Sequence, residues 1–285
     1  MTDSPDTPWT RYEQRIENTI AYIHSHLSEP LTSDTLAEVA HLSPYHWHRI
    51  YRAIAGESAA ATVKRSRMHK AAADLLRTDK SIEEIGTSVG YAMHSFNRKF
   101  KDYYGTAPGQ FRQANQPPRK DAANPARDAP TRYPVTVETK VDMHLIGYWH
   151  TGDFMDIGQT FSRAMAACQM HGLMPPNPVT AGVYYADPDI TSLENLRSFA
   201  GVSVPPDASV PEGMEKVIYR GGRFATMTHQ GPYALLNQSY QWLFGCWLPA
   251  SSEAVRDQPC CEIYLNTPLD TDPADLLTAI CLPIE

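Results

Sequence analysis

The sequence lacks any apolar run long enough to cross a bilayer. None of its stretches approaches the about 18 apolar residues that a membrane helix needs. The opening residues, MTDSPDTPW, contain no basic segment followed by an apolar one, which is the pattern of a secretory signal. We therefore expect a cytoplasmic protein with no membrane partner.

Cysteine is scarce and is not spaced as in a structural framework. The five cysteines are Cys168, Cys246, Cys260, Cys261 and Cys281, and no two of them form a Cys-x-x-Cys pair. Disulfide scaffolds need an even count, and zinc sites need closely spaced pairs. We predict reduced, mostly buried thiols, and no motif in the sequence indicates a metal or a cofactor.

Positive charge is in short supply overall, but it is distributed unevenly. The net charge is −7, yet residues 1–120 carry 16 Lys and Arg against 13 Asp and Glu, whereas residues 121–285 carry 9 against 19. A polyanion is attracted to the first part and repelled by the second. The length of 285 residues, 42% of them apolar, suits two globular domains.

Residues 34 to 111 contain one pattern written twice, 49 positions apart. The copies read TLAEVAHLSPYHWHRIYRAIAG (Thr35 to Gly56) and IEEIGTSVGYAMHSFNRKFKDYYG (Ile82 to Gly105). Superposing them places Ala37 on Gly86, His41 on Gly90, Trp47 on Phe96 and Arg49 on Arg98. Two helices that cross steeply need a small residue at the crossing, a turn residue with positive φ and an apolar residue beyond the turn. Each copy has a candidate for all three, which predicts two helix-turn-helix motifs.

The second helix of each copy is expected to begin near Pro44 and near Met93, with aromatic residues on its packed side. The polar residues that remain include Tyr45, His48, Arg49 and Arg52 in the first copy and His94, Ser95, Arg98 and Lys101 in the second. A helix that enters a DNA groove needs an apolar face that fixes it and donors that reach base edges. These eight residues are therefore candidate DNA contacts. The alternative is that they only cover a solvated helix face.

A long helix is expected between the two motifs, from about Ser58 to Arg77. About 20 residues at 1.5 Å each span roughly 30 Å, close to the approximately 34 Å between successive major-groove faces on one side of B-DNA. The spacing predicts that one chain reads two adjacent major grooves without dimerising.

From Ile16 to Arg112 the residues resemble the DNA-binding domain of AraC/XylS-type transcription activators. The motifs SPYHWHRIYRAIAGES and SFNRKFKDYYGTAPGQFR carry the resemblance. It implies base contacts at Tyr45, His48 and Arg49 in the first recognition helix and at His94, Ser95 and Arg98 in the second. It also implies promoter DNA and RNA polymerase as partners.

The domain boundaries follow from proline and from the loss of large apolar residues after Phe111. We predict an all-α DNA-binding domain over residues 9–112, a linker over 113–134 because that segment is rich in proline, and an α+β domain over 135–285.

The second domain contains its own repeat, at a shift of 79 to 80 positions. The repeat matches His150 with His229, Phe154 with Tyr233, Phe161 with Tyr240 and Tyr184 with Tyr264. Each half reads as strand, turn, helix, strand, acidic turn and strand. This order predicts a pseudo-twofold α+β domain with two helices on one face of an antiparallel sheet.

Alternation along the strand Cys260 to Leu265 separates its side chains into two sets. We expect Ile263 and Leu265 to face the helices and Glu262 and Tyr264 to share the opposite face. Burial of a carboxylate beside aromatic rings raises its pKa unless donors or a cation stabilise the charge. The pattern favours a pocket for lipophilic small molecules, cations among them. The alternative is an exposed strand with Glu262 in solvent.

Residues from about Val135 to Glu285 resemble a GyrI-like effector-binding domain, in HQGPYALLNQSYQWLFGCWLP and in CEIYLNTPLDTDPADLLTAICLPIE. The resemblance implies a central groove with a glutamate at Glu262. The candidate aromatic walls are Tyr264, Tyr184, Trp149, Tyr148 and Trp242. In domain order, with the DNA-binding part first, the chain resembles Rob-type regulators.

These observations predict a one-component transcription regulator that binds DNA through its first domain and senses a hydrophobic effector through its second. The alternative is a GyrI-like hydrolase or sequestering protein for toxic small molecules, tethered to a DNA-binding domain. In a hydrolase, Glu262 with Tyr264 or Tyr184 would perform acid-base chemistry. Fusion to a two-motif DNA reader favours sensing over turnover, so we predict that the chain is not an enzyme.

Overall fold

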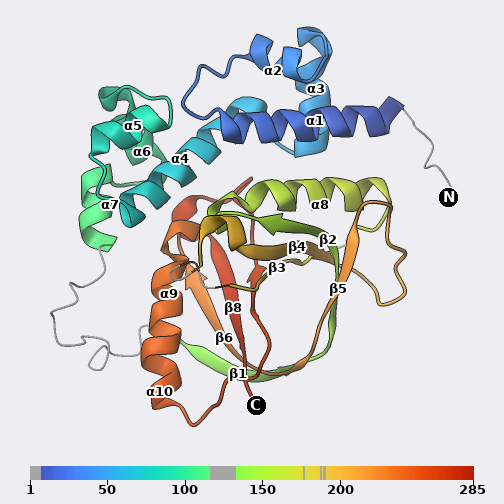
Figure 1. The fold of residues 1–285 in the computed structure, drawn as a ribbon, viewed down its shortest axis with the longest axis vertical. Helices are drawn as coiled ribbons and strands as arrows, with labels where there is room; N and C mark the ends of the chain where they lie inside the picture. Colours follow the sequence, from blue (N-terminus) through green and yellow to red (C-terminus); the bar gives the residue numbers. More distant parts are fainter. Residues whose placement is uncertain (1–7, 116–132, 176, 187, 189–190) are drawn as a thin grey trace. The chain divides into compact units, whose positions relative to one another are not determined.

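The computed structural model describes residues 8–115, 133–175, 177–186, 188 and 191–285. The chain divides into two compact units, Met1–Ala114 and Asn115–Glu285. Of the described residues, those of the first unit form helices alone, and those of the second form an antiparallel sheet with helices (Figure 1). The predicted fold class, an all-α domain followed by an α+β domain, is confirmed.

Seven helices lie in the described residues 8–115. They are α1 (Pro8–Ser25), α2 (Ser33–Val39), α3 (Pro44–Ala55), α4 (Ala59–Arg77), α5 (Ile82–Ser88), α6 (Met93–Tyr104) and α7 (Pro108–Asn115). The long helix α4 joins the group α1 to α3 to the group α5 to α7 (Figure 1). Helices α2 and α3 form the first helix-turn-helix motif, and α5 and α6 form the second.

Hydroxyl side chains begin three of these helices. Thr32 accepts a hydrogen bond from the Thr35 amide, and Ser58 accepts one from the Ala61 amide. Ser81 and Glu84 form a reciprocal capping box at the start of α5, which satisfies amides that have no partner within the helix. The helix starts therefore follow from the sequence itself.

The turns inside the two motifs have the same backbone conformation. His41 has a φ of 49° and Gly90 a φ of 75°, so both lie in the left-handed region, as the repeat predicted. At the crossing of α5 and α6, a Cβ atom on Gly86 would lie 3.1 Å from the Phe96 Cβ atom. The predicted small residue at that crossing is therefore needed for the close approach.

Eight strands build the sheet of the second unit. They are β1 (Val135–Lys140), β2 (Met143–Thr151), β3 (Thr180–Tyr184), β4 (Arg197–Ser203), β5 (Glu215–Tyr219), β6 (Gly222–Gln230), β7 (Cys260–Tyr264) and β8 (Leu277–Pro283). Their order across the sheet is β1-β6-β8-β7-β3-β4-β2-β5, and every pairing is antiparallel. The sheet curls strongly, as Figure 1 shows.

The order of the strands has a symmetric form. If β1 to β4 are exchanged with β5 to β8, the same order is obtained from the opposite edge, with β3 and β7 in the middle. This order is compatible with the sequence repeat, which itself stays a prediction.

Two helical segments cover one face of the sheet (Figure 1). The first is α8 (Gly158–Met170), preceded by the short helix η1 (Phe154–Asp156). The second runs from η3 (Tyr233–Leu235) through α9 (Leu236–Trp242) and a π-helical segment, η4 (Leu243–Trp247), into α10 (Leu248–Ala250). Ile146, Ala164 and Cys168 lie in the core under α8, and Leu236, Leu243 and Ile280 lie in the core under α9.

The other face of the sheet closes on a core of its own. Leu145, Val183, Phe199, Phe224 and Cys261 belong to one buried cluster, and Ile263 packs against it. Our expectation that Ile263 and Leu265 face the helices was therefore wrong. The alternation was right, but the curl of the sheet encloses the Ile263 side and leaves the Glu262 side under the helices, while Leu265 is exposed.

Three further expectations concern linker, cysteines and membrane. Helix α7 continues to Asn115, three residues into the predicted linker 113–134, and residues 116–132 lie outside the described part; the domain bounds stay a prediction.

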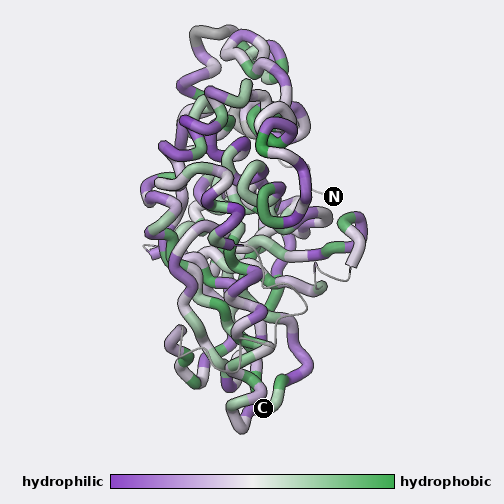
Figure 2. The backbone as a smooth tube through the Cα atoms, turned by 90° about the vertical axis from the view of Figure 1, so that its left-hand side faces the viewer, coloured by the Kyte–Doolittle hydropathy of each residue, from purple (hydrophilic) through white to green (hydrophobic). Residues whose placement is uncertain are grey.

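All five cysteines are free, and three of them are buried. No helix of the described residues is long and apolar enough to span a membrane, and Figure 2 shows hydrophobic and hydrophilic residues mixed over short intervals.

Candidate functional sites

Helix α3 turns two aromatic residues inward and its arginines outward. It begins after Ser43 with proline as its first residue, and it ends at Gly56, whose φ is 75°. Trp47 and Tyr51 are fully buried, with ring centroids 4.9 Å apart. Arg49 and Arg52 are exposed. The Tyr45 side chain lies outside the described part of the structure.

His48 is the exception among the predicted contacts of α3. Its Nε2 atom forms a hydrogen bond with Ser33 Oγ at 2.7 Å, and Trp47 Nε1 donates to the same oxygen at 3.3 Å. His48 is exposed but is held toward the first residue of α2. A base contact by His48 would require this hydrogen bond to break.

Helix α6 has the same arrangement of buried aromatic and exposed polar residues as α3. Phe96 and Phe100 are fully buried, with ring centroids 5.6 Å apart, and the helix ends at Gly105, whose φ is 73°. The predicted contacts His94, Arg98 and Lys101 are exposed, and Ser95 is half-buried.

The two recognition helices correspond residue by residue. Helices α2 and α5 have seven residues each, α3 and α6 have twelve each, and their bounds differ by the same 49 positions. The helical period of 3.6 residues places positions 45, 49 and 52, and equally 94, 98 and 101, opposite the buried aromatic pair. His48 and Ser95 lie beside these rows.

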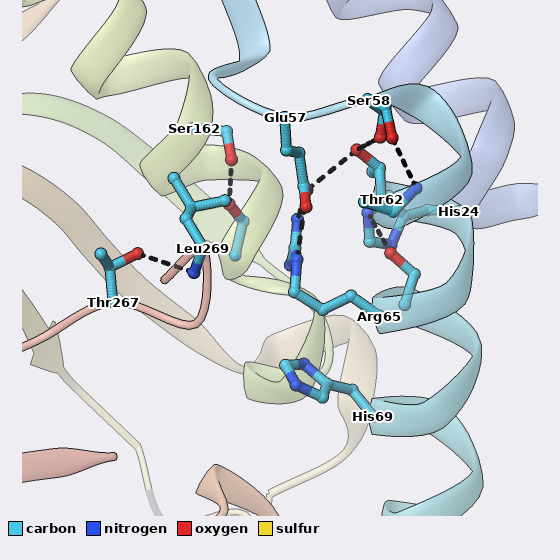
Figure 3. Close-up of polar contacts among 12 residues, drawn as sticks. His24, Glu57, Ser58, Thr62, Arg65, His69, Ser162, Thr267 and Leu269 are labelled. Carbon is cyan, nitrogen blue, oxygen red and sulfur yellow. Dashed lines mark hydrogen bonds and ion pairs between the residues drawn. The ribbon is translucent and has the colours of Figure 1, made fainter. Parts of the chain in front are cut away.

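Polar contacts attach α3 and the segment that follows it to α4, and Figure 3 shows those of Glu57 with Thr62 and Arg65. Tyr51 donates its hydroxyl hydrogen bond to Thr62 Oγ1 at 2.9 Å, and Thr62 donates to Glu57 Oε1 at 2.9 Å. Arg65 forms an ion pair with Glu57 at 2.6 Å, and both side chains are largely buried. Burial raises the pKa of Tyr51 to about 12, so its hydroxyl remains a donor at neutral pH.

A buried carboxylate lies at the centre of the second unit. Glu262 on β7 is 5% exposed. Its Oε1 atom accepts a hydrogen bond from Tyr240 at 3.0 Å and its Oε2 atom accepts one from Tyr264 at 2.8 Å. The Tyr264 and Tyr184 hydroxyls lie 2.5 Å apart. Burial raises the pKa of the Glu262 carboxyl above its ordinary 4.5, and the phenol hydrogen bonds oppose that rise.

The aromatic groups at this site come from both helical segments. The Tyr264 ring centroid lies 5.0 Å from that of Phe161 in α8 and 5.4 Å from that of Tyr233 in η3. The Tyr184 ring lies 4.8 Å from that of Phe154 in η1. Our list of walls omitted these three residues and Tyr240. The signal was present, because the repeat pairs Phe154 with Tyr233 and Phe161 with Tyr240.

The predicted walls Trp149 and Trp242 do not lie at Glu262. Trp149 packs against the enclosed core on the other face of the sheet, and its Nε1 atom donates to Glu215 at 2.9 Å. The Trp242 ring lies 5.3 Å from that of Tyr133 in the core under α9.

Tyr148 shares the face of Glu262 but lies three strands away. In the register of the sheet, Tyr148 pairs with Ala200, Ala200 with Gly182, and Gly182 with Glu262. The Tyr148 ring instead lies under the Arg163 guanidinium, whose Cζ atom is 3.7 Å from the ring centroid. Of the predicted ligand residues, the structure therefore brings together Glu262, Tyr264 and Tyr184.

Gly182 makes room for this arrangement. A Cβ atom at Gly182 would lie 2.9 Å from the Tyr184 hydroxyl oxygen, so the tyrosine passes over a strand position that has no side chain. At this site and in the rest of the described residues, no three His, Cys, Asp or Glu side chains gather in a way that would hold a metal ion.

Two family models match the chain. A GyrI-like small molecule binding domain matches residues 133–285, and a helix-turn-helix domain matches residues 36–114. The first therefore covers the unit that contains Glu262, and the second covers both recognition helices.

Curated relatives of the chain include transcription regulators. The transcriptional regulator Rob of Salmonella typhimurium is 21% identical over 285 residues, which cover 95% of this chain and 98% of Rob. The bifunctional transcriptional activator/DNA repair enzyme AdaA of Bacillus subtilis is 34% identical over 113 residues, or 39% of this chain and 51% of AdaA. This chain spans 29 to 51% of the length of AdaA and three other such relatives.

A solved structure with sequence similarity is the C-terminal domain of AraT, a response regulator from Geobacillus stearothermophilus. It is 31% identical, with a TM-score of 0.37, and it covers 42% of this chain and 98% of its own. The GyrI-like match extends over more than half of the residues. The chain therefore belongs to the family of proteins with a GyrI-like small molecule binding domain, preceded in this case by an AraC-type helix-turn-helix domain.

Proposed function

We propose that the chain is a one-component transcription regulator that reads two adjacent major grooves of promoter DNA as a single polypeptide. The observation that carries the proposal is the equivalence of α3 and α6, which have the same length, the same pair of buried aromatic positions and exposed arginines at Arg49 and Arg98. Helix α4, with 19 residues, is about 28 Å long, which suits helices placed about one DNA turn apart.

Arginine at equivalent positions fits base reading better than general attraction to phosphates. Its guanidinium forms two parallel hydrogen bonds with guanine in the major groove, whereas lysine offers a point charge. Exposed Arg52 and Lys101 follow one turn later in each helix and suit contacts with the DNA backbone.

The DNA-binding test begins with selection of duplexes from a random pool by the full-length protein. We expect the recovered sites to be protected over two successive turns. Arg49→Ala and Arg98→Ala should each lower the affinity by about 1 to 3 kcal/mol, and Arg49→Lys should keep non-specific binding but lose sequence preference. Arg220→Ala, in an exposed ion pair of the second unit, is the control. Unchanged sequence preference in both alanine variants would refute the assignment.

We further propose that the GyrI-like unit binds a lipophilic effector at Glu262. The support is a carboxyl that accepts hydrogen bonds from one phenol on β7 and one on α9, with a third phenol, on β3, bonded to the first. Aromatic rings from both helical segments lie beside them. A lipophilic cation would gain from the aromatic faces and from the carboxylate charge. In this proposal the protein acts in the cytoplasm, where effector binding changes its action on RNA polymerase at the promoter.

A pair of probes matched in shape and opposite in charge tests this site. Tetraphenylphosphonium should bind the wild type, and Glu262→Gln should weaken it at least tenfold, which is about 1.4 kcal/mol. Binding of tetraphenylborate should not weaken in the same variant. Glu215→Gln, which changes a carboxyl on the other face of the sheet beside Trp149, is the control. Equal phosphonium affinity in wild type and Glu262→Gln would remove the proposed role of the glutamate.

Hydrolysis or sequestration of a toxic small molecule is the alternative function. The observation in its favour is that a carboxyl of raised pKa beside phenols suits general acid-base chemistry. We propose binding without turnover because a helix-turn-helix domain precedes this unit, so that effector binding alone would have an output. Incubation of candidate ligands with the protein, followed by mass spectrometry, decides between the two, since a product formed only by the wild type would favour hydrolysis.

A further inference from the structure

Arg67 lies in the middle of α4 and contacts segments that lead to both helix-turn-helix motifs. Its Nη2 atom donates a hydrogen bond to the backbone carbonyl of Glu29, in the segment between α1 and α2, at 2.6 Å. Its guanidinium carbon lies 4.9 Å from the ring centroid of Tyr91, in the turn between α5 and α6. One side chain therefore joins the entry to the first motif to the turn of the second.

The packing around Arg67 leaves little freedom at this junction. Arg67 is 8% exposed. A Cβ atom on Gly90 would lie 2.8 Å from Arg67 Nη2 and 2.8 Å from the Leu27 carbonyl oxygen. On the other side, Lys99 of α6 extends its ammonium to 5.3 Å from the centroid of the same Tyr91 ring. The segment that follows α1 and the turn between α5 and α6 thus meet α4 at Arg67, and α6 contributes Lys99.

A small bend of α4 at this junction would displace one recognition helix substantially relative to the other. If α4 bent by about 5° over its roughly 28 Å, one recognition helix would move by about 2.5 Å relative to the other. The rise of one base pair is about 3.4 Å, so such a bend would blur the distinction between neighbouring spacings of two half-sites. Since Arg67 is buried, it is not itself available to read a base.

We propose that Arg67 is a positioning residue that fixes the separation and rotation of α3 and α6, and so makes the protein selective for one spacing between its two DNA half-sites. This proposal rests on the proposed function. A buried guanidinium is not needed for stability alone, because a protein with an apolar side chain of similar volume at such a position is often as stable. Arg67→Met is therefore expected to fold, and its defect should appear in spacing selectivity.

The first experiment measures affinity as a function of half-site spacing. Duplexes selected by the full-length wild type receive insertions or deletions of one or two base pairs between the two protected segments, and binding is followed by fluorescence anisotropy. Each inserted base pair rotates one half-site by about 35°, and we expect the wild-type affinity to fall roughly tenfold at the first insertion, as for a mismatched contact. Arg67→Met should bind the selected spacing more weakly and differ less than about threefold between spacings.

Two variants control for charge and folding. Lys70→Met removes one positive charge from an exposed position of the same helix, so it should weaken all spacings equally. Arg67→Lys keeps the charge but cannot reach both partners with a planar fork, so its spacing profile should lie between those of wild type and Arg67→Met. A uniform loss of affinity in Arg67→Met, with the wild-type spacing profile retained, would overturn the proposal.

The second experiment does not depend on DNA. Spin labels on unnatural amino acids at the exposed positions Ala53 in α3 and Asp102 in α6 report the distance between the recognition helices by pulsed electron paramagnetic resonance. We expect one narrow distribution in wild type and Lys70→Met and a broad one in Arg67→Met. If the wild type selects no DNA sequence, the proposed function fails, and the distances still decide whether Arg67 fixes the helices. An unchanged distribution in folded Arg67→Met refutes the positioning role.

Discussion

Two glycines of the second helix-turn-helix motif provide a matched test of the packing in the first unit. Gly90 and Gly105 both have left-handed backbone, with φ of 75° and 73°. At Gly105, no heavy atom of the described residues lies within 4 Å of the position of an added Cβ atom, whereas at Gly90 a backbone oxygen, that of Leu27, lies 2.8 Å from it. Alanine at Gly105 therefore reports backbone strain alone, and alanine at Gly90 reports strain together with a collision.

The magnitudes of the two terms are separable. Left-handed backbone costs an L residue about 1 to 2 kcal/mol, and the lower freedom of the unfolded alanine chain offsets about 0.4 to 1 kcal/mol of this. Gly105→Ala should therefore destabilise by about 1 kcal/mol. Overpacking of a close-packed site adds about 1 to 3 kcal/mol, because the Leu27 carbonyl or the Gly90 turn must shift. Gly90→Ala should lose about 2 to 4 kcal/mol in all.

Hydrogen exchange read by mass spectrometry on the full chain measures both losses in peptides from α5 and α6. Thermal unfolding gives a second readout, since 1 kcal/mol corresponds to about 4 to 8 °C for a domain of about 100 residues. Peptides from β7 and β8 serve as internal controls, because neither glycine lies in that unit. Equal destabilisation by the two substitutions would refute the argument that Leu27 and Arg67 are packed against the turn.

Three more predictions concern the turn, the cap and the buried carboxyl. His41 occupies the position equivalent to Gly90 with a φ of 49°, so His41→Gly should raise the free energy of unfolding in urea by up to about 1 kcal/mol; a loss of stability would contradict the strain. Ser81→Ala removes the capping-box bond that the Glu84 amide donates to Ser81 Oγ, whereas the bond from the Ser81 amide to Glu84 can remain. The substitution should cost about 1 kcal/mol, and Ser81→Asp should retain most of this stability in the same urea titration. Burial raises the pKa of Glu262 above 4.5, so the folded state retains a proton that the unfolded state has lost. The stability that this proton confers is complete below pH 4.5 and is lost as the pH rises through the raised pKa. The stability of Glu262→Gln relative to wild type should therefore increase as the pH rises above 4.5, and a difference that does not change with pH would exclude burial as the cause.

The helical unit was predictable because its signals are local. Hydroxyl caps at Thr32, Ser58 and Ser81 mark helix starts, and Gly56 and Gly105 mark helix ends in both copies. The 49-residue repeat provided an independent check, because both copies had to place a residue with positive φ at the same position of the turn. His48 was less predictable, because its hydrogen bond to Ser33 depends on how α2 and α3 cross.

The sheet was predictable in its alternation but not in its orientation. Period 2 along β7 correctly separated Glu262 and Tyr264 from Ile263, yet alternation alone does not say which set meets the helices. The curl of the sheet decides that, and the curl depends on pairing between strands far apart in sequence, such as β3 with β7. Trp149 was misplaced for the same reason, because its face follows from its register with β4.

A glycine has the same structural role in each unit, and this role could not be predicted from the sequence. At Gly90 the missing side chain admits the Arg67 guanidinium, and at Gly182 it admits the Tyr184 phenol that reaches toward Glu262. A glycine can be required for its backbone conformation or because another side chain packs closely against it. The sequence alone shows neither which reason applies nor which distant side chain packs there. Arg67 on a long helix and Tyr184 on a short strand are such distant side chains, separated in sequence from Gly90 and from Glu262. At both sites a large side chain therefore packs against a glycine, Arg67 against Gly90 and Tyr184 against Gly182. Such pairs can be identified only once the fold shows that the two residues are neighbours.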